Sequence, residues 1–212
     1  AGGGRWSEHG GPIGDPTIAL SVPTGPWSRG LSPAILPSGS ILAPSRLPPC
    51  DPLCSHGVTL YGTTGSPLWS FNTSSAVVSS PAVDPRGPYV FVADHAGDVA
   101  SLSAATGRVA WRYSTGSPVS APLTAAPSGE LCCAGLLLVG TEGGMLHAVG
   151  LGDGSARWAF QGGDRLGSRA VLGGAWTLPD GVLFAGMNGF VTRLLPVSGA
   201  VAWRFSAGAG FE

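Results

Sequence analysis

The chain has 212 residues, enough for one large all-β domain; 43% are hydrophobic and only 11% are charged. Its formal net charge is −1, without the excess of basic residues typical of nucleic-acid-binding proteins, so no nucleic-acid partner is expected. The longest apolar run, residues 131–140, is too short to cross a bilayer and no signal peptide is visible, so no membrane span is expected and the compartment stays open.

The first part of the chain is the least regular. Residues 1–30 are rich in proline and glycine, which fits either the degenerate end of a structural unit or a linker. Residues 31–45 are a weak copy of a pattern that recurs later, and residues 46–56 are predicted to be an inserted loop. One β domain with internal repeats is therefore expected over residues 31–212.

Four segments share one frame, in which glycine stands four residues before tryptophan and an aromatic residue follows two later. The four tryptophans are spaced by 42, 47 and 45 residues, which indicates a repeated structural unit. The glycines and tryptophans of this frame are Gly65, Trp69, Gly107, Trp111, Gly154, Trp158, Gly199 and Trp203.

Each unit is predicted to contain four short strands. A Ser/Pro-rich strand is followed by a Val/Leu-rich strand, a glycine turn, a third strand and the tryptophan strand. Gly97, Gly144 and Gly189 occupy the glycine turns, where tight hairpins need a residue that tolerates positive φ. Short strands at this spacing favour an all-β fold of four-stranded antiparallel blades, about four to five in number.

A single four-stranded sheet cannot bury both of its faces. Radial stacking of such sheets as blades of a β-propeller covers the faces and leaves only short edges. A large aromatic side chain on the outer strand can fill the wedge between neighbouring blades, and a nearby glycine permits close backbone approach to the indole. The repeated tryptophans are therefore predicted to be structural contacts between blades and not ligand-binding platforms.

This frame resembles the tryptophan-docking repeat of the pyrroloquinoline-quinone (PQQ) repeat β-propellers, also called quinoprotein alcohol dehydrogenase-like. The family pattern is Ala-x-Asp-x-x-Thr-Gly-Lys-x-x-Trp, and residues 101–111 keep Thr106, Gly107, the basic Arg108 and Trp111. The resemblance covers roughly residues 31–205. The position of the family's aspartate is occupied by Tyr61, Ser103, Gly150 and Leu195.

The resemblance also implies an incomplete ring. Complete propellers of the family have seven or eight blades, whereas four docking strands and a partial fifth are visible here. The chain is therefore expected to be a partial propeller, either a fragment of a longer protein or a segment whose missing blades come from a second copy or another chain.

Cys132 and Cys133 are the sharpest candidates for a cofactor site. In PQQ-dependent alcohol dehydrogenases a disulfide between adjacent cysteines packs against the quinone, and the resemblance would give that role to this pair. Their place at the start of an apolar strand favours core packing instead, because free cysteine packs as a small hydrophobic residue. PQQ with calcium is expected only if the chain belongs to such an enzyme, and no cofactor is assigned otherwise.

Other polar residues have structural explanations. Asp94 and Asp98 flank a turn, where aspartate bonds to its own backbone, and Glu142 lies in another turn. Cys50, Cys54 and His56 could begin a zinc site, but a fourth ligand is not visible nearby, and a local disulfide or free thiols are equally compatible. No catalytic residue and no metal ligand are assigned.

The sequence therefore predicts a non-catalytic propeller segment that acts as a protein-interaction or ligand-binding scaffold. Protein partners, or missing blades of the same propeller, are expected to contact the loops: residues 46–56 and the turns near His95, Glu142 and Asn188. Two alternatives stay open: a fragment of a PQQ-dependent alcohol or sugar dehydrogenase, and the propeller end of a multidomain adenylate-forming enzyme.

Overall fold

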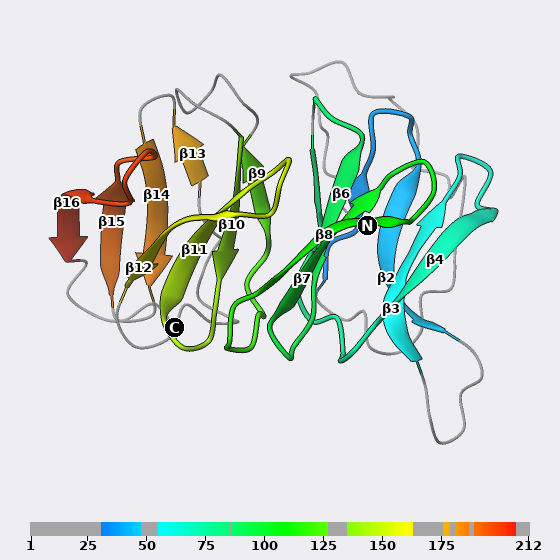
Figure 1. The fold of residues 1–212 in the computed structure, drawn as a ribbon, viewed down its shortest axis with the longest axis horizontal. Coiled ribbons are helices and arrows are strands. Elements are labelled where there is room, and N and C mark those ends of the chain that lie inside the picture. The colour runs from blue at the N-terminus through cyan, green and yellow to red at the C-terminus, as the bar shows by residue number, and fades with distance from the viewer. Residues whose placement is uncertain are drawn as a thin grey trace, which may run out of the picture.

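Every regular element in the described part of the chain is a β-strand, and the strands form four sheets of four strands each (Figure 1). In Figure 1 the sheets follow one another in chain order, from blue to red. We number them blade 1 to blade 4. The predicted all-β architecture of four-stranded antiparallel blades is confirmed, with four blades. This computed structural model describes residues 31–47, 55–84, 86–126, 135–162, 176–178, 181–186 and 189–206.

In every blade the strands pair antiparallel in simple sequence order, so that each strand lies beside the one that follows it. The first strand of each blade is short, and the fourth is the outer strand that carries the repeated tryptophan. The strands of the first two blades are β1 (Ala34–Ile35), β2 (Ile41–Leu47), β3 (Ser55–Tyr61), β4 (Pro67–Thr73), β5 (Ala82–Val83), β6 (Tyr89–Ala93), β7 (Asp98–Ser103) and β8 (Val109–Ser114).

Blades 3 and 4 repeat this plan. The second strands of blades 2 and 3 read YVFVA and LLLVG and are almost fully buried, because neighbouring blades cover both of their faces. The strands of the last two blades are β9 (Thr124–Ala126), β10 (Leu136–Gly140), β11 (Met145–Gly150), β12 (Ala156–Gln161), β13 (Trp176–Leu178), β14 (Gly181–Gly186), β15 (Phe190–Leu194) and β16 (Val201–Ser206).

Glycine turns join the second and third strands, as the sequence predicts. Gly97, Gly144 and Gly189 have φ values of 97°, 80° and 77°. These values lie in the left-handed region, where a side chain would strain the backbone. In all four blades the register between the third and fourth strands also shifts next to the tryptophan, so a bulge accompanies each docking residue.

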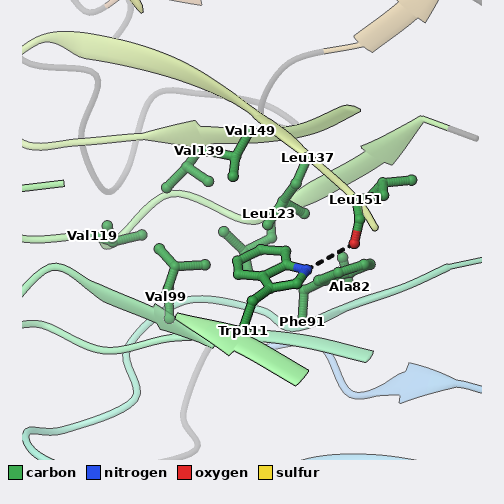
Figure 2. Close-up of a cluster of buried hydrophobic side chains, with 11 residues drawn as sticks. Ala82, Phe91, Val99, Trp111, Val119, Leu123, Leu137, Val139, Val149 and Leu151 are labelled. Carbon is green, nitrogen blue, oxygen red and sulfur yellow. Dashed lines mark hydrogen bonds between the residues drawn. The ribbon is translucent and has the colours of Figure 1, made fainter. Parts of the chain in front are cut away.

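Among the described residues, the core forms three clusters, each between two consecutive blades. The cluster between blades 1 and 2 contains Leu36, Leu42, Val58, Leu60, Val77, Val90, Val92, Ala100 and Leu102. The cluster between blades 2 and 3, shown in Figure 2, contains Ala82, Phe91, Ala93, Val99, Trp111, Val119, Leu123, Leu137, Val139, Val149 and Leu151. The cluster between blades 3 and 4 contains Ala126, Leu136, Leu138, Leu146, Ala148, Trp158, Val182, Phe184 and Leu194.

The weak early copy of the repeat, residues 31–45, supplies β1 and most of β2 of blade 1. The hairpin between β2 and β3 is paired as far as Leu47 and Ser55. The outer residues of the range 46–56 therefore belong to strands, and residues 48–54 lie outside the described residues, as do residues 1–30.

Candidate interaction surface

Each tryptophan of the first three blades reaches into the blade that follows it. Its indole N–H donates a hydrogen bond to a backbone carbonyl in the turn between the third and fourth strands of that next blade. The donor–acceptor pairs are Trp69 to Ala104 (2.9 Å), Trp111 to Leu151 (2.9 Å) and Trp158 to Pro196 (2.7 Å).

The same indole lies directly on a glycine of that turn. A Cβ atom added to Gly107 would stand 2.7 Å from the Trp69 ring, and the same distance separates Gly154 from Trp111 and Gly199 from Trp158. Each glycine thus receives the indole of the preceding repeat, and not that of the tryptophan four residues after it. We call the glycine and the carbonyl three residues before it a socket.

Trp203, the tryptophan of blade 4, does not contact a socket in the described residues. No sheet follows β16 in the described residues, and Trp203 is 43% exposed, against 8% for Trp111 and 9% for Trp158. Phe205, on the same side of the strand, is 61% exposed. We call Trp203 and Phe205 the β16 face, and Figure 1 shows β16 at the end of the row of blades.

The opposite end of the row differs in chemistry. On the side of blade 1 turned away from blade 2, a chain of hydroxyl groups crosses three strands. The Ser45 and Thr59 oxygens are 2.8 Å apart, and the Thr59 and Ser70 oxygens are 2.9 Å apart. Thr59, at the centre of this chain of hydroxyl groups, is buried, whereas Ile35 and Leu68 of the same blade are exposed.

Asp94 is a structural residue, as its turn position predicts. Its buried carboxylate accepts hydrogen bonds from the backbone N–H groups of Ser75 (3.1 Å), Ala96 (3.0 Å) and Asp98 (3.1 Å), and from the Ser74 hydroxyl (2.6 Å). The carboxylate therefore fixes the β6–β7 turn and ties it to the segment that leaves blade 1.

Two of the turns predicted to contact partners are present at the surface. His95 is exposed and Glu142 is partly exposed. Their backbone N–H groups donate to the carbonyls of Ala76 and Pro118, both at 2.8 Å, so both turns are held against the preceding connection. Asn188 lies outside the described residues.

The structure brings together a pair that the sequence does not announce. Between blades 2 and 3, the Tyr113 hydroxyl and His147 Nδ1 are 3.0 Å apart, and His147 is 8% exposed. Burial lowers the pKa of His147 below its ordinary value of 6.5 and raises the pKa of Tyr113. The only hint in the sequence is a histidine at the centre of the apolar stretch MLHAV.

The cysteine candidates cannot be placed. Cys50, Cys54, Cys132 and Cys133 lie outside the described residues, and His56 is a partly buried residue of β3. Within the described ranges, no three His, Cys, Asp or Glu side chains are grouped so that they could hold a metal ion. No helix in these ranges is long and apolar enough to cross a membrane.

A family model described as outer membrane protein assembly factor BamB matches residues 56–169, which is more than half of the chain. No curated protein matches.

Three solved structures have a similar fold. BamB from Moraxella catarrhalis has a TM-score of 0.66 and 22% identity over 83% of this chain and 48% of that one. BBS1N in complex with ARL6DN has a TM-score of 0.59 and 17% identity over 84% and 53%. The computationally designed Ika8 protein has a TM-score of 0.62 and 13% identity over 85% and 63%. The chain thus spans about half to less than two thirds of each.

Proposed function

The chain belongs to the PQQ-repeat family of BamB-like β-propellers, and from this premise we propose that it is a non-catalytic scaffold that binds a protein partner. The observation that carries the proposal is the β16 face. Blades 2 and 3 bury their tryptophans against the next blade and blade 1 buries its tryptophan in part, whereas blade 4 presents the same side chain, with Phe205, to solvent.

The energetics support this use of the face. Burial of apolar surface contributes about 25 cal/mol per Å², so covering an aromatic side chain such as Trp203 or Phe205 favours association by roughly 1.5–3 kcal/mol. Tryptophan is also among the residues that most often dominate binding at protein interfaces. A contiguous exposed apolar surface on a folded domain is typical of an interaction site.

The comparisons agree with such a role. The matching family model is that of an assembly factor, and one of the similar structures is a complex of BBS1N with ARL6DN. The second similarity is one of fold alone, because the sequence identity is 17%. It supports the proposal only by showing that a protein of this fold can bind a protein.

Site-specific photocrosslinking tests the proposal. A photoreactive amino acid replaces Phe205 in the full-length protein, in the cell that makes it, and a matched variant carries it at Leu68, which is similarly exposed at the other end of the row. We expect one discrete protein adduct from position 205 and none of the same mass from position 68. Equal adducts from both positions, or none from position 205, would contradict a specific surface.

The dehydrogenase alternative makes a different prediction. A PQQ-dependent enzyme should bind the quinone saturably in the presence of Ca²⁺ and then reduce an electron-accepting dye when an alcohol or sugar is added. We expect the full-length protein to do neither. Saturable PQQ binding with dye reduction would refute the non-catalytic proposal, whatever the crosslinking shows.

A further inference from the structure

The interface between blades 2 and 3 contains a buried histidine that faces a tyrosine. The neighbours of His147 along β11, Leu146 and Ala148, belong to the cluster between blades 3 and 4, so His147 itself points to blade 2. Its ring meets the ring of Tyr113 on β8 edge-on, with 5.8 Å between the centroids, and Nδ1 lies 3.0 Å from the Tyr113 hydroxyl. The pair therefore bridges the two blades within an otherwise apolar interface.

The neighbouring interfaces have no ionisable side chain at the matching positions. Tyr113 stands two positions after the tryptophan of blade 2, and blades 1 and 3 have phenylalanine there: Phe71 and Phe160. His147 precedes the residue of the third strand that pairs with the tryptophan, and the matching residues of blades 2 and 4 are Ala100 and Thr192. The pair is thus particular to one interface and is not a property of the repeat.

This position suits a neutral imidazole better than a charged one. A neutral ring carries one N–H group, and the Tyr113 hydroxyl is able to donate to Nδ1 or to accept from it. Nε2 has no hydrogen-bond partner among the described residues, although the side chain of His147 is buried. A protonated ring donates from both nitrogens, so its Nε2–H would be buried without an acceptor. The buried charge adds a desolvation cost to the missing hydrogen bond.

The charged groups on the strands of blade 2 that face this histidine's blade are turned the other way. Asp98 of β7 accepts a hydrogen bond from the Ser74 hydroxyl at 3.2 Å. Arg112 of β8 lies over the Phe71 ring, 5.5 Å from its centroid. Both groups therefore face blade 1, and Tyr113 is the ionisable residue of these two strands that faces blade 3.

The remaining ionisable groups on the surrounding elements are not bonded to the histidine in the described residues. Asp84 bonds within the turn after β5, Tyr89 of β6 packs on the apolar cluster, Arg157 and Asp153 form an exposed ion pair at 3.0 Å, and Glu142 is partly exposed in the β10–β11 turn. The connection 115–123 has no ionisable side chain. Burial therefore lowers the pKa of His147 without a contribution from a charged neighbour.

We propose that the interface between blades 2 and 3 is an acid-sensitive joint, in which protonation of His147 favours opening while the interfaces on either side stay closed. When the two blades separate, water reaches both ring nitrogens and solvates the charged form. The open form therefore binds a proton more tightly than the closed form. Opening uncovers Leu137, Val139 and Val149, which are fully buried in the closed form. The inference does not depend on the β16 face and adds a conformational device to the proposed scaffold.

The pH window of the joint follows from this difference in proton binding. Above about pH 6.5 the histidine is neutral in both forms, so this group adds no pH dependence to opening. As the pH falls below that value, the open form takes up a proton that the closed form does not bind. The ratio of open to closed molecules then rises by up to about tenfold per pH unit, until the lowered pKa of the closed form is reached.

The docked indoles provide a separate reporter for each interface. The Nε1–H groups of Trp69, Trp111 and Trp158 each donate a hydrogen bond across one of the three interfaces. Exchange of these hydrogens with D₂O is followed by NMR at about pH 7.5 and 5.5, on the full chain labelled with ¹⁵N at tryptophan. Because the three reporters are the same chemical group, the ratio of two rates removes most of the intrinsic effect of pH on exchange.

The expected result is a change at one interface alone. The exchange rate of Trp111 relative to that of Trp158 should rise about five- to tenfold between the two pH values. The rate of Trp69 relative to that of Trp158 should change by less than about twofold. Parallel acceleration of all three would mean that acid acts on the whole segment, and an unchanged Trp111 ratio would mean that the joint does not respond. Either result would overturn the inference.

Matched variants use the residues that neighbouring repeats carry at the same positions. His147→Thr and His147→Ala copy blades 4 and 2, and both should remove the acid response of the Trp111 reporter. Tyr113→Phe copies blades 1 and 3 and should keep the response, because the titrating ring stays buried. A response that survives both His147 substitutions, or that Tyr113→Phe abolishes, would overturn the assignment to His147. If a variant fails to fold, the ratios measured on the wild type decide the matter.

Discussion

The interface between blades 2 and 3 and the β16 face present the same residue in opposite states. Trp111 and Trp203 stand at matching register positions, each beside a bulge and paired with the centre of the third strand. Trp111 is buried among valine and leucine side chains and bonded to Leu151 (Figure 2), whereas Trp203 is exposed. The role of the residue is thus set by the blade that follows it and not by its own strand.

The largest expected effect comes from emptying the buried position. Trp111→Ala should lower the free energy of unfolding by about 3–5 kcal/mol, because it leaves a cavity between two blades and removes the donor to the Leu151 carbonyl. Urea denaturation followed by far-UV circular dichroism measures this. A loss below about 1 kcal/mol would mean that blades 2 and 3 are held together without the indole.

Adding a methyl group at a socket glycine should lower the free energy of unfolding by less than Trp111→Ala does. Gly154→Ala places a methyl group 2.7 Å from the Trp111 ring and strains a φ of 69°, for a loss of about 2–4 kcal/mol. Gly116→Ala is the matched control, since Gly116 has a φ of 71° with no atom within 4 Å of the added Cβ. It should lose only the backbone part, about 1–2 kcal/mol. Equal losses of stability for Gly154→Ala and Gly116→Ala in urea unfolding would show that the Trp111 indole moves to accommodate the methyl group.

The buried interface should also respond to pH, whereas the β16 face contains no titratable group. Because burial lowers the pKa of His147, the unfolded chain binds the proton more tightly than the folded one. The contribution of this histidine is therefore intact above about pH 6.5 and is lost as pH falls, by no more than about 1.4 kcal/mol per pH unit. Urea midpoints from pH 8 to 5 measure this contribution. The difference in stability between the wild type and His147→Gln should not depend on pH above about pH 6.5, and should change as the pH falls below that value.

The smallest effect is expected at the open end. Trp203→Ala should change the free energy of unfolding by less than about 1 kcal/mol, because much of the indole is already exposed to water and no blade covers it in the described residues. The same urea experiment measures it beside Trp111→Ala. A loss as large as that of Trp111→Ala would mean that the β16 face is covered in solution, and the contrast between the two tryptophans would collapse.

The fold could be predicted because it depends on features that repeat. Tryptophan at a near-constant spacing, glycine at hairpin turns and alternating strands indicate four-stranded blades, and the structure confirms them. The match to the family model confirms the resemblance to PQQ repeats, although the aspartate of the pattern is absent at Ser103 and Gly150. In the structure, the backbone carbonyls of those residues, not their side chains, bind the socket glycines.

The pairing of glycine and tryptophan could not be predicted from the frame. The two residues are four apart in every repeat, yet Gly107 contacts Trp69 and not Trp111. A repeat shows which residues recur, but contacts between neighbouring repeats appear only in three dimensions. Blade 1 also has one residue fewer between Leu60 and its partner Trp69 than blade 2 has between Ser101 and Trp111, and the regular spacing of Gly65 and Trp69 does not reveal this. The proposed roles of Cys132 and Cys133 stay predictions.

The forward direction of docking has a consequence for synthesis on the ribosome. Each tryptophan contacts a glycine that is synthesised after it. Gly107, which contacts Trp69, follows it by 38 residues, and Gly154, which contacts Trp111, follows it by 43 residues. At translation rates of about 5–20 residues per second, a nascent blade would expose an uncovered indole for roughly 2–9 s. During that interval each blade in turn has the exposed tryptophan that blade 4 has in the described structure, and a chaperone that binds exposed aromatic side chains would meet it repeatedly as the chain emerges.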